Sequence, residues 1–162
     1  MKNSTLTTWT EQHICMMTEA LKLAQKAAQE GEVPVGAVIV YHGKIIGRGY
    51  NHCIGLHDPS AHAEIQAIRQ AGLFLKNYRL PHCDLYVTIE PCTMCAGAIV
   101  HSRIQNLFYG ADEPKAGVAK SQQTIFSSGW FNHKVNVCGG LLAEESQKLL
   151  RDFFKLRRKV KK

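Results

Sequence analysis

Apolar residues recur along this chain with two different periods. Between Thr10 and Glu30 they fall at steps of three and four, which predicts an amphipathic helix that ends at Gly31. Thr8 and Glu11 have the spacing of a capping box for the start of this helix. Similar patterns predict further helices at 61–71, 91–102 and 142–158.

Other segments predict β-strands. The runs VGAVIVY (35–41) and KIIGRGY (44–50) flank the turn His42-Gly43 and predict a hairpin. Later strands are expected at 84–90, 104–110 and 134–138. Since helices connect the later strands, the sheet should be antiparallel at the hairpin and largely parallel afterwards. The pattern predicts an α/β domain of three layers, α/β/α, in which helices flank a mixed five-stranded sheet.

The length and composition favour one globular domain over residues 1–162. Hydrophobic residues make up 45% and charged residues 20%, which is typical neither of a disordered nor of a membrane protein. No apolar run approaches the roughly 18 residues of a membrane-spanning helix, so no membrane partner is expected. The first residues, MKNSTLTTWTEQH, lack the pattern of a signal peptide, which favours a cytoplasmic location.

Positive charge is concentrated at the C-terminal end. Residues 151–162 hold seven Lys or Arg and one Asp, which accounts for nearly all of the formal net charge of +7. Such a segment is either a solvated tail or a contact surface for a polyanion such as nucleic acid. Phe153 and Phe154 lie beside it, and they can stack on bases or pack the last helix onto the core.

Of the six cysteines, Cys92 and Cys95 form a C-x-x-C pair in the stretch EPCTMC. Pro91 suits the first position of a helix, so both cysteines should lie on one face of its first turn and reach one ion. The positive helix N-terminus also favours thiolates. By itself, a C-x-x-C pair can instead be a redox site or half of a structural zinc site. Cys15 and Cys138 are expected to be packing residues.

His62 and Glu64 lie near another predicted helix start, in DPSAHAEIQAI (58–68). Two strand-to-helix crossovers of a parallel sheet open at the same edge, so His62 can meet Cys92 and Cys95. Three protein ligands and one open position are typical of catalytic zinc. Glu64 can then exchange protons at the open position. The alternative is a closed structural site with Glu64 as an ordinary acid. Its candidate fourth ligands are Cys53, Cys83, Cys138 and the seven other histidines.

His62-Ala63-Glu64 followed by Pro91-Cys92-Thr93-Met94-Cys95 matches the H-x-E…P-C-x-x-C signature of zinc-dependent nucleobase deaminases. The likeness continues in GEVPVGAVIV (31–40), GYN (49–51), DPSAHAEIQAIRQA (58–71), YVTIEPCTMCAGAIVHSRI (86–104), NHKVNVCGG (132–140) and the basic C-terminus. Over most of its length the chain resembles the bacterial tRNA-specific adenosine deaminases. The resemblance implies a cytidine-deaminase-like fold and one zinc ion per subunit.

The resemblance also implies a reaction. A zinc-bound hydroxide would attack C6 of adenine, Glu64 would act as the proton shuttle, and ammonia would leave inosine behind. The substrate would be the wobble adenosine in the anticodon stem-loop of tRNA-Arg(ACG), bound by a homodimer. Asn51 would hydrogen-bond the target nucleotide, and the backbone around Val33 and Ala63 would line the base pocket.

Two further residues are candidates for RNA contact, Lys115 for phosphate and Phe154 for a base. Asn51 can instead be a turn residue, Lys115 can simply be exposed, and His133 is expected to brace a loop. Residues 118–130, VAKSQQTIFSSGW, depart from the family pattern, which leaves loop contacts and fine substrate preference open.

Two other functions stay open. The same zinc chemistry on a free base or nucleoside, such as guanine or cytosine, would not need the basic C-terminus. A non-catalytic, zinc-stapled RNA-binding module would need four protein ligands to the metal.

Overall fold

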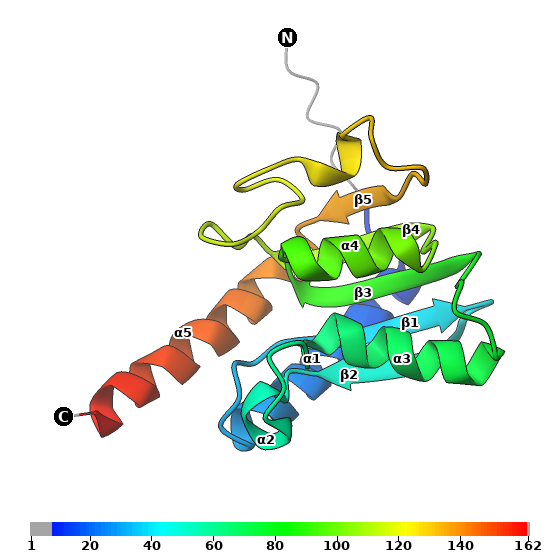
Figure 1. Cartoon of the computed structure of the whole chain (residues 1–162). Coiled ribbons are helices and arrows are strands. Elements are labelled where there is room, and N and C mark those ends of the chain that lie inside the picture. Colours follow the sequence, from blue (N-terminus) through cyan, green and yellow to red (C-terminus); the bar gives the residue numbers. More distant parts are fainter. Residues whose placement is uncertain (1–7, 162) are drawn as a thin grey trace, which may run out of the picture.

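The computed structural model describes residues 8–161, so residues 1–7 and 162 of the predicted domain lie outside it. A sheet of five strands, in the order β2-β1-β3-β4-β5, is covered by helices on both faces (Figure 1). The elements are α1 (Glu11–Gln29), β1 (Gly36–Tyr41), β2 (Lys44–Tyr50), α2 (Cys53–Leu56), α3 (Ala63–Leu75), β3 (Cys83–Ile89), α4 (Thr93–His101), β4 (Asn106–Ala111), the 3-10 helix η1 (Ile125–Ser127), β5 (Asn136–Gly139) and α5 (Ala143–Val160). The predicted mixed sheet and three layers are confirmed.

Strand direction brings two helix starts to one edge of the sheet. β1 pairs antiparallel with both β2 and β3, whereas β3, β4 and β5 pair in parallel. β2 and β3 therefore run in the same direction, although β1 lies between them. Because both strands end at the same edge, α3 and α4, which follow them, begin there.

The helices divide between the two faces. α3 and α4 cover one face and contact each other, while α1 and α5 cover the other face (Figure 1). Each face has its own apolar core. The larger core lies under α3 and α4 and includes Ile39, Leu85, Val87, Ile99 and Leu107. The smaller core includes Met17, Leu21, Val38, Tyr86 and Leu141. Among residues 8–161, no helix combines the length and the apolar character that crossing a membrane requires.

The start of α1 differs from the prediction. Thr10, not Thr8, caps the helix: its hydroxyl oxygen accepts the backbone N–H of His13 at 3.2 Å. In return, His13 Nδ1 accepts the N–H of Thr10 at 3.2 Å. The predicted capping box of Thr8 and Glu11 is therefore wrong, because a histidine takes the place of the usual acid or amide at the third helical position.

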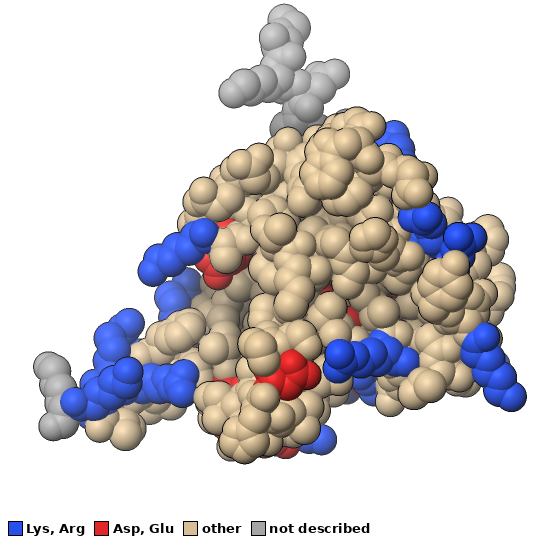
Figure 2. All heavy atoms as spheres, in the orientation of Figure 1, with Lys and Arg blue, Asp and Glu red and all other residues tan. Residues whose placement is uncertain are grey.

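Two loops contain short helices that the sequence pattern did not predict. α2 lies within the expected loop 51–60, and η1 lies within the irregular segment after β4. Cys15 and Cys138 are exposed, so the prediction that they pack in the interior is wrong. α5 projects from the body, and Lys and Arg side chains gather over its far end (Figure 2).

Candidate functional site

His62 and Cys92 occupy equivalent places at two helix starts. His62 is the N-cap of α3 and Cys92 is the N-cap of α4, while Cys95 lies in the first turn of α4. Pro91 was expected as the first residue of α4, but the helix begins two residues later, at Thr93. Cys92 thus precedes the helix rather than belonging to its first turn. The sulfurs of Cys92, in extended backbone, and of Cys95, in the helix, nevertheless both lie near His62.

The three predicted ligands do come together. His62 Nδ1 lies 3.7 Å from Cys92 Sγ and 3.5 Å from Cys95 Sγ. Zinc bonds of about 2.05 Å to nitrogen and about 2.3 Å to sulfur, at a tetrahedral angle, place the two donor atoms about 3.6 Å apart. The donor types and their separations therefore fit one zinc ion.

No fourth protein ligand joins this group among residues 8–161. His62, Cys92 and Cys95 are the only His, Cys, Asp or Glu residues there that form a set of three or more within ligand distance, with donor atoms within 4.8 Å of one another. The candidates Cys53, Cys83 and Cys138 and the other histidines lie outside it. One tetrahedral position is therefore left for a non-protein ligand, as in catalytic zinc sites.

Glycines in β2 allow α3 to lie close to the sheet. A Cβ atom on Gly49 would collide with the carbonyl oxygen of Ala63, and one on Gly47 would collide with that of Ala67. Gly47 and Gly49 are two residues apart in the strand, so both lie on the face of the sheet that α3 covers. Without side chains there, the first turns of α3 rest directly on β2, and His62 is fixed relative to the sheet.

A hydrogen bond between the two cysteine side chains shifts their pKa values in opposite directions. The hydrogen bond with Cys95 lowers the pKa of Cys92 to about 4, against the opposing effect of burial, and His62 lowers it further. The same contact raises the pKa of Cys95, and burial raises it again. A divalent cation would stabilise both thiolates.

Glu64 lies beside the three ligands and is almost completely buried. It is the second residue of α3, and its relative exposure is 3%. Burial raises the pKa of its carboxyl above the ordinary value, and the nearby Cys92 raises it further. A buried carboxyl group with a raised pKa is suited to take up and release a proton, as a general acid and base must.

Of the predicted base-pocket residues, Asn51 and Ala63 meet at the start of α3. The side-chain oxygen of Asn51 accepts the N–H of Ala63 at 2.9 Å. Ala63 is fully buried, whereas Asn51 and Val33 are half-buried. Asn51 therefore has a structural role that the sequence did not reveal, and its side-chain NH2 group is the part suited to a substrate contact.

The other two predicted RNA contacts meet elsewhere. Lys115, in the loop after β4, and Phe154, on α5, line one hollow of about 660 Å³. Its remaining lining residues are Leu150, Arg151, Asp152, Lys155 and Arg158. The hollow is strongly basic, which suits a polyanion. His133 does brace a loop, as predicted, through a contact of 2.8 Å between Nε2 and the carbonyl oxygen of Ile104.

Two buried acids near the site were missed by the sequence analysis. Glu90 lies between the end of β3 and Pro91 and is 2% exposed, and Glu32 is 3% exposed. The carboxylate of Glu32 accepts the N–H groups of Ile54 and Gly55 at 3.2 and 2.8 Å, so it holds α2. The sequence does carry one signal for Glu90: this acid directly follows the apolar run YVTI (86–89) and ends a predicted strand.

Comparison with known proteins decides the family. The family described as the cytidine and deoxycytidylate deaminase zinc-binding region matches residues 10–111. The tRNA-specific adenosine deaminase of Haemophilus influenzae is 51% identical over 148 residues, which cover 91% of this chain and 86% of that protein. The chain belongs to the tRNA-specific adenosine deaminase family. It is thus an enzyme of the zinc-binding deaminase type, and its His62, Cys92 and Cys95 are positioned to bind the ion.

Solved structures agree with the fold of this deaminase. A structure from studies of A-to-I editing by tRNA:A34 deaminases at the wobble position of transfer RNA has a TM-score of 0.82 at 46% identity, covering 84% of this chain and 99% of that one. The guanine deaminase of Bacillus subtilis has a TM-score of 0.62 at 34% identity, covering 90% and 94%. The expected cytidine-deaminase-like fold is confirmed.

Proposed function

We propose that this deaminase converts the wobble adenosine of tRNA to inosine, and that its substrate is the anticodon stem-loop of tRNA-Arg(ACG). The observation that carries the proposal is the buried Glu64 beside a set of three metal ligands. The relatives at high identity are named tRNA-specific adenosine deaminases, and the basic hollow on α5 suits a nucleic acid.

The ligand set accounts for the nucleophile. Zinc held by His62, Cys92 and Cys95 would supply Lewis acidity, which makes water nucleophilic at neutral pH. The buried Glu64 takes a proton from the attacking water, because its raised pKa suits proton uptake. It passes that proton to the adenine ring, and it then carries the second proton of the same water, from the oxygen now bonded to C6, to the departing amine. A bond forms between C6 and oxygen, the bond between C6 and nitrogen breaks, and ammonia leaves.

The remaining residues bind and orient the RNA. The NH2 group of Asn51 donates to the target nucleotide, and the backbone around Val33 and Ala63 borders the base. Lys115 and Phe154 bind the flanking RNA in the basic hollow, by phosphate attraction and base stacking respectively. A homodimer would present two such surfaces to tRNA.

The test is inosine formation on a synthetic arginine anticodon stem-loop that carries ACG, compared with the same stem-loop carrying GCG. Free adenosine, cytidine and guanine are assayed in parallel, with Glu64→Gln as the inactive control. We expect turnover on the ACG stem-loop alone, lost in the variant. Guanine is the second candidate substrate, because a guanine deaminase shares the fold at 34% identity. Turnover on guanine alone would contradict the RNA proposal and retain the zinc chemistry.

A further inference from the structure

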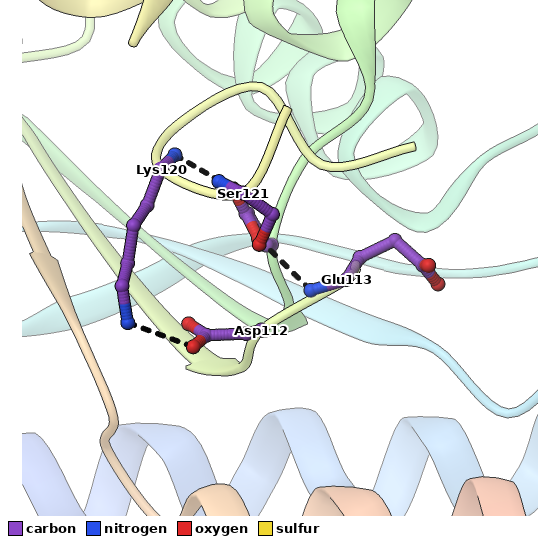
Figure 3. A network of polar contacts seen from close by, with 5 residues as sticks. Asp112, Glu113, Lys120 and Ser121 are labelled. Atoms are coloured by element: carbon purple, nitrogen blue, oxygen red, sulfur yellow. Dashed lines mark hydrogen bonds and ion pairs between the residues drawn. The ribbon is translucent and has the colours of Figure 1, made fainter. Parts of the chain in front are cut away.

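Glu90 is a buried carboxylate whose donors all come from one loop. It accepts the backbone N–H groups of Glu113, Lys120 and Ser121 at 2.9, 2.7 and 2.8 Å, and also the hydroxyl of Ser121. These donors belong to residues 112–121, here called the 112–121 loop, which follows β4. Figure 3 shows Glu113, Lys120 and Ser121 close together, with the Lys120 ammonium directed to Asp112. That ion pair measures 2.8 Å and lies at the exposed outer side of the loop.

The loop also rests directly on the segment that carries the metal ligand. The N–H of Val118 donates to the carbonyl oxygen of Pro91 at 3.0 Å. Gly117 is buried against the Glu90 carboxylate, and a Cβ atom there would collide with it. Glycine is therefore required at this position, and the carboxylate is enclosed by the loop that it holds.

A second hydrogen bond extends the connection to Lys115. The carboxylate of Glu113 accepts the N–H of Lys115 at 2.9 Å, while the N–H of Glu113 itself donates to Glu90. Lys115 is thus two hydrogen bonds away from Glu90. Its exposed side chain forms the loop's side of the basic hollow, opposite Phe154 and Arg158 of α5.

We propose that Glu90 is a positioning residue for RNA: its carboxylate holds the 112–121 loop so that Lys115 faces α5 across the basic hollow. Glu90 acts through Lys115 on RNA binding and not on the chemical step at Glu64. The proposal rests on the proposed function in one respect, that the substrate is an RNA. Four hydrogen bonds to an ionised, buried acceptor hold a loop more firmly than neutral acceptors would, which is why glutamine is a poor substitute.

The experiment is a double-mutant cycle of Glu90→Gln and Lys115→Ala, with Asp112→Asn as the matched control. The control also removes one carboxylate charge and loosens one contact of the same loop, but it does not touch Glu90. For each protein one measures kcat and KM on the ACG stem-loop, the dissociation constant for that RNA, zinc content, and amide hydrogen exchange at Lys120 and Ser121.

In Glu90→Gln we expect faster exchange at both amides and KM and Kd raised about fivefold, the size of one exposed charge contact. We expect kcat and zinc content to be unchanged. In the Lys115→Ala background, Glu90→Gln should add nothing, because its effect passes through Lys115. Asp112→Asn should leave all of these quantities close to those of the unmodified enzyme. If Glu90→Gln does not fold, Ser121→Ala, which removes one of the four donors to the carboxylate, serves in its place.

Additive effects of the two substitutions on Kd would overturn the proposal, because Glu90 would then not act through Lys115. Loss of zinc, or a lower kcat with unchanged KM, in Glu90→Gln would also overturn it, because either result would place Glu90 in the metal site. Unchanged RNA affinity with faster amide exchange would reduce Glu90 to a fold-stabilising role and also overturn it. The two proposals can fail separately. If Glu90→Gln weakens stem-loop binding but the unmodified enzyme forms no inosine, the positioning role is supported and the proposed reaction is refuted.

Discussion

The side-chain oxygen of Asn51 accepts a hydrogen bond of 2.9 Å from the backbone N–H of Ala63, which ties the end of β2 to the start of α3. His62, the N-cap of α3, immediately precedes that amide, so the contact also orients a metal ligand. The oxygen of Asn51 therefore positions the helix, and the proposed contact with the nucleotide falls to its NH2 group.

Asn51→Asp separates these two tasks. Aspartate keeps an oxygen for the Ala63 amide at a helix N-terminus, where negative charge is favourable, but it has no donor for the substrate. We expect normal zinc content, stability within about 1 kcal/mol of the unmodified enzyme, and a loss of at least roughly tenfold in kcat/KM on the stem-loop. Asn51→Ala should lose stability as well. Full activity in Asn51→Asp would assign Asn51 to helix positioning alone.

Glu64→Gln tests the proton shuttle. Glutamine has nearly the same shape but cannot take a proton, so turnover on the stem-loop should fall by about 10²-fold or more. Because Glu64 is not among the three ligands, zinc content should stay at one ion per chain. Metal analysis and single-turnover kinetics on the same preparation make the comparison. Parallel loss of zinc and activity would refute the assigned role.

The zinc ligands could be predicted from the sequence because their placement depends on local spacing and on strand direction. His62 and Cys92 each follow a strand and precede a helix, and two such junctions at one edge of a sheet must lie near each other. The exact helix start was not predictable in this way: Pro91 fits the first helical position by propensity, yet α4 begins at Thr93.

The Glu90 contacts could not be read from the sequence for a different reason. Its partners lie 23, 30 and 31 residues further along the chain, in a segment without a regular period. Hydrophobic periodicity predicts helices and strands, but it does not predict which residues an irregular loop will contact. The short α2 was missed similarly, since four residues are too few for a helical pattern and the helix depends on the buried Glu32.

The basic end of α5 should contribute to RNA affinity through charge. Reversing Arg157 and Arg158 to glutamate should weaken stem-loop binding and make the dependence of log Kd on log salt less steep. The matched control reverses Lys44 and Lys76, which are also exposed but lie at the sheet edge opposite to the start of α3. Both variants change the net charge equally. Equal loss of affinity in both would mean that only overall charge matters, and unchanged affinity in both would make the α5 end a solvated tail.

Buried Cys83, at the start of β3, should make the fold sensitive to alkaline pH. The side chain is fully buried, and this burial raises the pKa of the thiol from 9.0 to about 11, with a smaller effect from the charge of Asp84. The folded pKa exceeds the unfolded one, so the neutral thiol's stabilising contribution is complete below pH 9 and is lost as the pH rises toward 11. A shift of two pKa units corresponds to about 2 to 3 kcal/mol.

Cys83→Ala removes this titration. Its stability at pH 8 should be lower, because a small buried volume is lost, but its further decline between pH 8 and 11 should be smaller than that of the unmodified protein by about 2 kcal/mol. Urea denaturation of both proteins under reducing conditions, at intervals across this pH range, measures the difference. The other buried titrating groups, such as Tyr109, whose pKa burial raises to about 12, are common to both proteins and cancel in the comparison. Parallel curves would show that the ionisation of Cys83 does not contribute to alkaline unfolding.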